Sequence, residues 1–442
     1  MKKFYSRSSK NYWISIVSVL FSVSFLFSQN EKKENEFKPS GKVWGYMFGD
    51  FFYKADGLAE AGPDSFTVAK GDTLVKIKRW GDTEFAKVPK NFYAFTFRRI
   101  YLGYDYQFTP QISSRILLES NDGILTPGGD RTVFIKLLNL EWKNILPNQT
   151  LKLGQIGTPT WQTFVEPQWG YRSVEKTIFD MRRIGRSNDV GIGISGIVLD
   201  RKTRSSDSAG ISKQVLNISY NAVWGNGMAS KPENNSLKVF YGEIIFKFLG
   251  CISLEGYGEY DYSDNVYPSG ANKGKKYSTA KSIYRGFLGY ENEYFAGGIE
   301  SIKQFQENVK IAAIDSATDI KKDTSLLTQT GLSLWAKGTI IKEKLFVFVR
   351  HDFFNSDAGR RGWEYYRQDN DARRYNEKFY LIGVDWRPAR NIQVMPNLWI
   401  NSYKDMSSNE IDFRATGSKE FLTKSVNRKA DIVARITLFY KF

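Results

Sequence analysis

The C-terminal stretch ADIVARITLFYKF, residues 430–442, decides the fold, because its apolar and polar side chains alternate with the period of a β-strand. Its apolar face consists of Ile432, Ala434, Ile436, Leu438, Tyr440 and Phe442. Its other face carries Asp431, Arg435, Thr437 and Lys441, together with Val433 and Phe439. Successive side chains of a strand point to opposite sides of a sheet. This strand therefore has one side suited to an apolar environment and one suited to water.

Segments of similar character recur along the chain, and no helical period of useful length interrupts them. They are rich in Tyr, Phe, Val, Ile and Gly. We count sixteen segments, at residues 42–54, 91–106, 110–120, 131–143, 149–157, 189–200, 213–224, 236–248, 251–262, 280–290, 292–303, 326–337, 344–354, 376–387, 391–403 and 429–442.

The connections between these segments alternate in length. The long ones are residues 55–90, 121–130, 158–188, 225–235, 263–279, 304–325, 355–375 and 404–428. The others are mostly tight, with 201–212 as the exception. In an antiparallel meander, this parity places large loops at one rim and short turns at the other, as in outer-membrane barrels. The sequence therefore predicts an all-β fold, a transmembrane antiparallel β-barrel of about 16 strands with long outer loops and short periplasmic turns.

Composition narrows the possible functions. The 442 residues carry a net charge of +16, with one Cys and one His. A single cysteine excludes an intramolecular disulfide and a zinc site built from cysteines. A single histidine excludes a site with several histidine ligands. The mean hydropathy of −0.42 argues against a bundle of membrane helices, but alternating barrel strands also average out as polar.

The N-terminus predicts export. Residues 1–28 combine a basic start with an apolar stretch from Trp13 to Phe27, as in a cleaved signal peptide, the alternative being an uncleaved membrane anchor. Residues 29–41 then form a short periplasmic segment, and residues 42–442 form a single outer-membrane β-barrel. We expect the outer membrane of a Gram-negative-type cell, with the aromatic terminus Phe442 as the signal to the barrel assembly machinery.

The connection 158–188 is the candidate constriction. A sixteen-strand barrel encloses an aqueous channel unless a loop narrows it. This connection has eight large apolar residues, which a purely solvated loop would not keep. We therefore expect this third outer loop to fold inward and to present its basic residues to the pore. These are Arg172, Lys176, Arg182, Arg183 and Arg186.

The barrel wall adds further inward-facing charge. The predicted lumen-lining basic residues are Arg99, Arg115, Lys152, Arg350 and Arg435. Acidic residues expected on the same face are Asp105, Glu119, Glu141, Asp352 and Asp385. Guanidinium groups suit carboxylate and phosphate oxygens, so the basic residues could form a track for anions. Alternatively, the opposite charges brace each other and leave little selectivity.

Several stretches resemble the family of outer-membrane porins that includes the phosphate-selective porins. They are GYMFGDFFY (45–53), FRRIYLGYDY (97–106), WGYRSVEKTIFDMRRIGRSNDVGI (169–192), VMPNLWIN (394–401) and the terminal Phe442. The resemblance implies a sixteen-strand barrel, often trimeric, with an inward-folded third loop, whose basic residues are the candidates for selectivity. The dense lysine and arginine ladder of the phosphate-selective members is not evident as a repeat.

The sequence thus predicts a passive channel for small hydrophilic or anionic solutes, phosphate among the candidates, that catalyses no reaction. The expected partners are outer-membrane lipids, the assembly machinery and, in a homotrimer, two further copies. No cofactor, metal or nucleic acid is implied. The alternatives are a solute-specific transporter, a barrel scaffold with a closed lumen, and an outer-membrane hydrolase using His351, which no G-x-S-x-G motif supports.

Overall fold

The computed structural model describes residues 37–58, 64–70, 73–80, 84–122, 126, 129–203, 214–233, 235–266, 276–309, 322–355, 373–374, 376–404 and 429–442. Residues 1–40 and 41–442 form two separate units. The predicted signal peptide, residues 1–28, lies outside the described residues, as does most of the predicted periplasmic segment 29–41.

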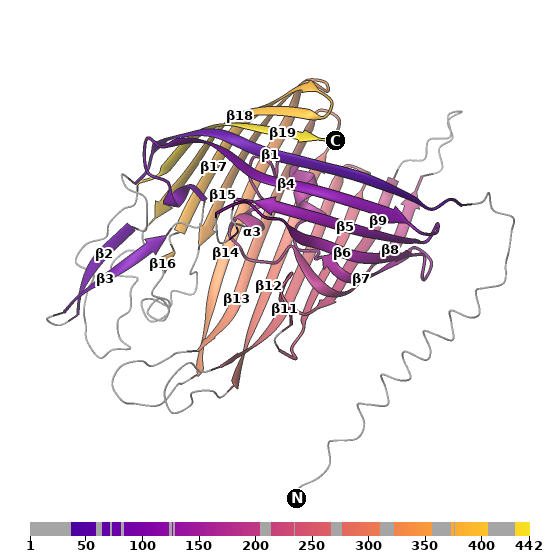
Figure 1. Ribbon diagram of the computed structural model, residues 1–442, viewed down its shortest axis with the longest axis horizontal. Helices are drawn as coiled ribbons and strands as arrows, with labels where there is room; N and C mark the ends of the chain where they lie inside the picture. The colour runs from indigo at the N-terminus through magenta and orange to yellow at the C-terminus, as the bar shows by residue number, and fades with distance from the viewer. Residues whose placement is uncertain are drawn as a thin grey trace, which may run out of the picture. The chain divides into compact units, whose positions relative to one another are not determined.

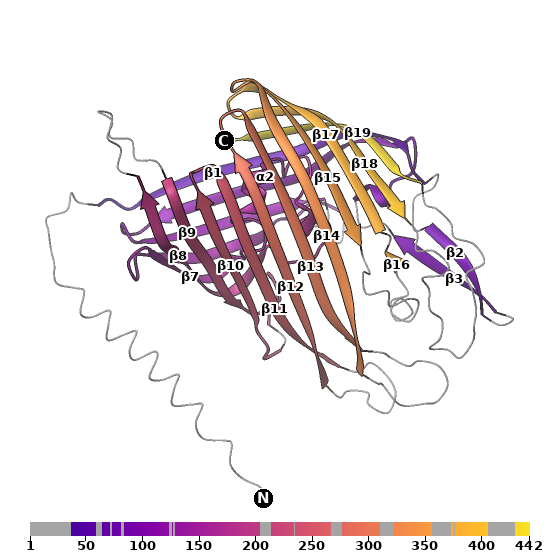
Figure 2. The same cartoon turned by 180° about the vertical axis from the view of Figure 1, so that it is seen from behind.

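A closed barrel of sixteen antiparallel strands makes up the second unit (Figures 1 and 2). Its strands are β1 (Ser40–Asp56), β4 (Tyr93–Gln107), β5 (Ile112–Asn121), β6 (Phe134–Lys143), β7 (Gln149–Gly157), β8 (Asn188–Lys202), β9 (Gln214–Gly225), β10 (Val239–Phe248), β11 (Ile252–Val266), β12 (Lys276–Glu291), β13 (Phe295–Val309), β14 (Lys322–Ile341), β15 (Leu345–Asn355), β17 (Asn376–Ala389), β18 (Ile392–Lys404) and β19 (Asp431–Lys441). Each strand pairs with its neighbours in the chain, and β1 pairs with β19 to close the ring. The predicted fold class and all sixteen predicted strands are confirmed.

The two faces of the barrel differ as the alternation predicts. In β19, Ile436 and Leu438 point outward and keep 48% and 46% of their surface exposed. Asp431 and Arg435 point inward and are buried. The outside is therefore apolar, and the inside carries the charges.

The predicted parity of the connections is also present. Residues 108–111, 249–251 and 342–344 link strands at one end, whereas residues 57–92 and 158–187 link them at the other. Among the described residues, no helix has the length and apolar character needed to cross a membrane.

A small second sheet was not predicted. It consists of β2 (Asp64–Lys70), β3 (Thr73–Trp80) and the two-residue strand β16 (Arg373–Arg374), which pairs parallel to β3. Its strands come from two long connections that the sequence suggested were loops. A short helix, η1 (Glu84–Lys87), follows β3 in the first of these connections.

Candidate functional site

The segment between β7 and β8, residues 158–187, lies inside the barrel, and we call it the inner loop. It contains two short helices, α2 (Val165–Trp169) and α3 (Ile178–Met181). Gly170 ends α2 in the left-handed conformation, at φ 75°, and its N–H donates to the carbonyl of Glu166. Glycine adopts this conformation at little cost, so the chain can turn sharply after α2.

Apolar packing holds the inner loop against the wall. Phe164, Val165, Trp169, Val174 and Met181 are buried in one cluster with inward-facing residues of the barrel. Those wall residues include Phe287, Trp335, Phe348, Phe379, Trp399 and Val433. A second cluster joins Trp161, Ile178, Phe179 and Ile184 of the loop to wall residues such as Tyr241, Tyr257 and Ile302. The barrel wall thus has apolar patches on its inner face where the loop covers it.

Cations of the wall hold the loop's backbone. Arg98 donates to the carbonyls of Ser173 and Val174 at 3.0 Å each, Arg435 to Val174 at 3.0 Å, Lys337 to Gln168 at 2.8 Å, Arg285 to Pro159 at 3.4 Å, and Arg350 to Lys176. Buried carbonyl groups need such partners, because an unpaired one costs free energy. These strand cations therefore fix the path of the inner loop.

Two of the five predicted selectivity residues, Arg182 and Arg186, pair with carboxylates of the wall. Arg182 is fully buried and forms an ion pair with Glu377 of β17. Arg186 pairs with Asp261 at 2.7 Å and with Glu259 at 3.3 Å, both on β11. Arg182 consequently has no contact with water in the lumen, and the charge of Arg186 is balanced.

The other three, Arg172, Lys176 and Arg183, reach solvent to different extents. Arg172 is partly exposed and bridges Glu166 and Asp180, the latter at 2.8 Å. Lys176 is half-buried, and Arg183 is exposed, with a positive φ of 56°. These three therefore reach water, as does Arg186 with 25% of its side chain exposed, and only Arg182 is fully buried.

Opposite Arg172 lies the wall formed by β4, β5 and β6. Arg99 of β4 pairs with Glu119 at 3.4 Å, and Lys136 of β6 pairs with the same carboxylate at 3.3 Å. The hydroxyl of Tyr101 accepts hydrogen bonds from Arg99 at 3.0 Å and from Arg172 at 3.5 Å. Loop and wall thus meet here in a cluster of mixed charge, which we call the constriction cluster.

Two carboxyl groups of the inner loop in this cluster have opposite pKa shifts. Burial raises the pKa of Glu166, and the nearby Asp180 adds to this effect, although Arg172 opposes it. Burial would also raise the pKa of Asp180, but Arg172, Lys176 and Arg99 outweigh it and lower the pKa. Of these two carboxyl groups, Glu166 therefore takes up a proton first as the pH falls.

The remaining predicted basic residues of the wall are each paired with an acid. Arg115 binds Asp105 with two hydrogen bonds, at 2.6 and 2.8 Å, and Lys152 pairs with Glu141 at 3.1 Å. These two pairs are partly exposed. Arg350 pairs with Asp352 at 2.5 Å, but this pair and Arg435 are buried beneath the inner loop. Of the five wall residues, water reaches Arg99, Arg115 and Lys152.

The first long connection also enters the interior, which the sequence did not predict. Phe85 of η1 is buried against Trp399, with ring centroids 5.0 Å apart. Glu84 pairs with Arg98 at 2.9 Å, and Lys54 donates to the carbonyl of Phe85 at 2.8 Å. The EFAK sequence itself carries no recognisable signal. The apolar inner positions, such as Trp399 and Phe379, were the available hint that something covers them.

His351, the residue considered for a hydrolase, points outward. Its ring stacks on that of Tyr380, with centroids 4.1 Å apart. Asp352, its neighbour in the sequence, is fully buried on the inner face. Adjacent residues of a strand point to opposite sides, so this aspartate cannot orient the imidazole.

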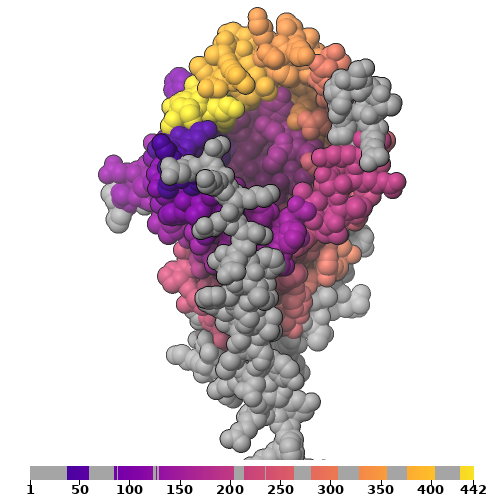
Figure 3. All heavy atoms as spheres, turned by 90° about the vertical axis from the view of Figure 1, so that its right-hand side faces the viewer, coloured from indigo at the N-terminus to yellow at the C-terminus, as the bar shows by residue number. Residues whose placement is uncertain are grey.

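The interior is hollow at the end where β1 begins. Figure 3 shows this hollow between the strands nearest the two ends of the barrel sequence and those of its middle, with part of the chain visible deep inside.

Comparison with known proteins supports the fold. No family model matches the chain, and no curated protein matches it. Among solved structures, the outer-membrane channel DcaP of Acinetobacter baumannii has a TM-score of 0.53 at 10% identity, covering 93% of this chain and all (100%) of that chain. The anion-selective porin from Comamonas acidovorans has a TM-score of 0.50 at 10% identity, covering 92% of this chain and 100% of that chain. The chain therefore has the fold of the outer-membrane porins.

Proposed function

We propose that the protein is an outer-membrane porin, a passive water-filled channel for small hydrophilic solutes. The observation that carries this proposal is the division of the closed barrel into an exposed apolar outside and a charged inside. Lipid is the environment that suits the outside, and a hydrated passage suits the inside. The long connections would then face the cell exterior and the short turns the periplasm.

We propose a weak anion preference, set at the constriction cluster. The cluster has the water-reaching cations Arg99, Lys136 and Arg172 against the carboxylates of Glu119, Glu166 and Asp180, and the inner loop adds Lys176 and Arg183 beside it. The balance is 5 − 3 = +2. Positive charge in a narrow pore lowers the barrier for anions. Because most of these cations are paired, the preference is small, and phosphate is one candidate anion among several.

The deciding experiment is a reversal potential across a salt gradient in a planar bilayer. We expect anion preference in the native protein and a weaker one after Lys176→Gln and Arg183→Gln together. Arg201→Gln and Lys202→Gln, at the short-turn end of β8, form the matched control and should leave the potential unchanged. Cation preference in the native protein would refute the proposal.

A barrel with a closed lumen is the second candidate. The inner loop and η1 both fill the interior, and Arg172 touches Tyr101 across the constriction cluster. Absence of current in bilayers that contain folded protein would favour this scaffold over the channel. A solute-specific transporter would instead show a current that one class of solute blocks.

Assembly is a further part of the proposal. Phe442 exchanges backbone hydrogen bonds with Gly45, at 2.9 and 3.2 Å, while its side chain stays exposed. The terminal aromatic is thus placed at the seam where the barrel closes and is available to the assembly machinery. We propose a homotrimer by analogy of fold, to be tested by the mass of the purified protein.

A further inference from the structure

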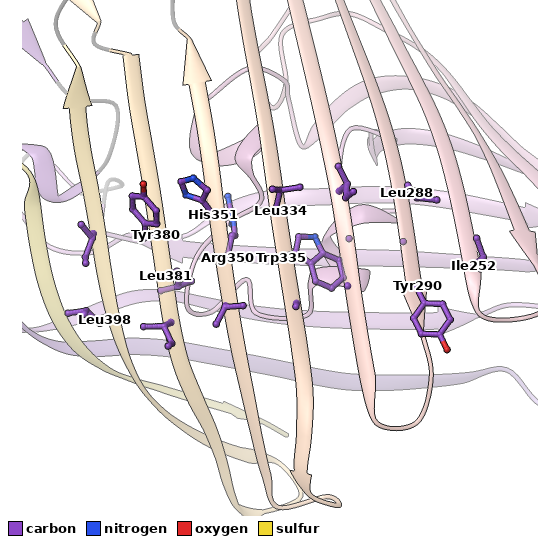
Figure 4. Close-up of a pocket in the computed structure, with 18 residues that line it drawn as sticks. Ile252, Leu288, Tyr290, Leu334, Trp335, Arg350, His351, Tyr380, Leu381 and Leu398 are labelled. Carbon is purple, nitrogen blue, oxygen red and sulfur yellow. The ribbon is translucent and has the colours of Figure 1, made fainter.

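An apolar groove lies on the outer wall of the barrel, over strands β11 to β18. Its volume is about 830 Å³, within the range of roughly 300–1,000 Å³ typical of ligand sites. Outward-facing side chains form its walls, namely Leu288, Ile299, Leu334, Val349, Ile382 and Leu398. Figure 4 shows Leu288, Leu334 and Leu398 along it. Gly297, which has no side chain, and Ala336, which has only a methyl group, belong to its lining and leave room for a ligand.

The groove has a polar end, on the side of the barrel where the long connections lie; we call it the long-loop end. His351 and Tyr380 stack there, with Phe353 against the histidine ring at 4.1 Å (Figure 4 labels the first two). Tyrosine and histidine combine an apolar body with a polar tip, which suits the boundary between hydrocarbon and head groups. The groove therefore runs from an apolar body to an interfacial end.

Two lysines stand beyond this end. Lys303 is four residues past Ile299 on β13, and Lys378 is four residues before Ile382 on β17, so both lie on the long-loop side. Both are exposed, and their ammonium groups lie 4.7 and 5.8 Å from the ring centroids of Phe305 and Phe353.

Among the side chains that the structure describes, no carboxylate beside these lysines lies on the outer face. Glu300, Asp352 and Glu377, the acids nearest to them in register among the described residues, are buried on the inner face. Three interstrand steps separate the lysine strands, or about 14 Å at roughly 4.8 Å a step. The lysines thus flank the groove and can each meet a separate anionic group.

We propose that this groove binds a phosphate-bearing lipid of the outer leaflet, with an acyl chain along the groove and its phosphates at Lys303 and Lys378. The inference rests on the membrane location in the proposed function. A lipid matches both the apolar body and the cationic end. A second copy of the chain is the other occupant, and the oligomeric state of the groove variant below distinguishes it from a lipid.

The test is native mass spectrometry of the full-length protein in detergent, titrated with diphosphoryl lipid A. We expect one tightly bound lipid per barrel and a loss of about 25-fold in affinity when Lys303→Gln and Lys378→Gln are combined, because each lysine contributes on the order of fivefold. The matched charge control, Lys143→Gln with Lys202→Gln at the short-turn end, should bind as the native protein does. Phosphatidylcholine, which carries no net charge, should bind more weakly than lipid A.

A second variant tests the groove itself. Ala336→Phe fills it and should weaken binding, whereas Ala222→Phe, an outward-facing alanine on β9 outside the groove, should not. Equal lipid binding by the native protein, the Lys303→Gln and Lys378→Gln double variant, and Ala336→Phe would overturn the proposal. So would loss of oligomers in Ala336→Phe with lipid binding retained, which would assign the groove to another copy. Failure of the native barrel to insert into lipid vesicles would instead refute the membrane location.

Discussion

Arg182 of the inner loop and Glu377 of β17 form an ion pair in which both side chains are fully buried, although 195 residues separate them. Asn401 also donates to the carboxylate of Glu377, at 2.6 Å. The pair joins the inner loop to strand β17 of the barrel wall. The guanidinium is therefore a structural anchor, in contrast to the pore-facing role that its sequence position suggested.

Replacing Arg182 by methionine should destabilise the protein, because it leaves the charge of Glu377 buried without its partner. Losses of about 3–5 kcal/mol are typical of such changes. Thermal unfolding followed by circular dichroism measures the effect. Arg182→Met with Glu377→Met should recover most of the loss, and Arg183→Met, at an exposed site, should change little. An Arg182→Met protein as stable as the native one would contradict the anchor.

Cysteine labelling should distinguish pore-facing from buried positions of the inner loop. In a Cys251→Ser background, Arg183→Cys should react with a charged methanethiosulfonate reagent and alter the conductance, since Arg183 is exposed. Val165→Cys is the matched control, because Val165 is fully buried in the same loop. Rapid labelling at position 165, or none at 183, would show that the loop takes another path.

The anion preference should rise as the pH falls from neutral. The pKa of Glu166 lies above its ordinary value near 4.5, chiefly through burial, whereas the pKa of Asp180 lies below its own. Acidification therefore neutralises Glu166 first and removes one negative charge from the constriction cluster. The reversal potential should shift towards anions as the pH is lowered from 7, before Asp180 titrates.

Glu166→Gln should show the higher anion preference already at pH 7 and lose this step. Asp180→Asn should also raise the preference at pH 7 but keep the step, because Glu166 is still present to titrate. If Glu166→Gln retains the full pH response, another group controls it.

Gly154→Ala in β7 should impair folding. Gly154 has a φ of 112°, and an added Cβ would lie 2.5 Å from the carbonyl oxygen of Leu138 on the neighbouring strand. Both the backbone and the space thus require glycine. Gly258→Ala in β11, where a Cβ would meet nothing within 4 Å, is the control. The fraction of folded barrel in a gel without heating measures the outcome, and equal fractions for the two variants would refute the argument.

The alternation of apolar and polar residues was sufficient to predict the barrel, because it identifies the outer and the inner face of each strand. Arg98 and Arg99 are adjacent in β4 and interrupt this alternation, because both reach inner-face partners, Asp50 and Glu119. The sequence was less informative about which acidic residue pairs with which basic residue. Ion pairs within the barrel wall follow from the register of neighbouring strands, as for Arg115 and Asp105, which lie opposite each other. Both residues were among the inward-facing residues predicted from the sequence.

The contacts of the inner loop could not be predicted, because they depend on the path of a segment without a repeating pattern. The sequence nevertheless gave one indication of a covered wall in β17, where Phe379 and Leu381 on one face alternate with Tyr380 and Ile382 on the other. A strand that is apolar on both faces is covered on both. That observation predicts a covered inner wall there, and Phe379 and Leu381 do pack in the cluster with Trp169 and Tyr171.

The pairing of β1 with β19 has a consequence for biogenesis. One edge of β1 pairs with β4, but its other edge finds its permanent hydrogen-bonding partner only when residues Asp431–Lys441 have been delivered, so the ring cannot be completed before then. Until then, two long rows of unpaired amides and carbonyls stay open to other chains, a known hazard for aggregation. A polypeptide truncated before Asp431 would keep both rows open indefinitely, and quality-control proteases should remove it.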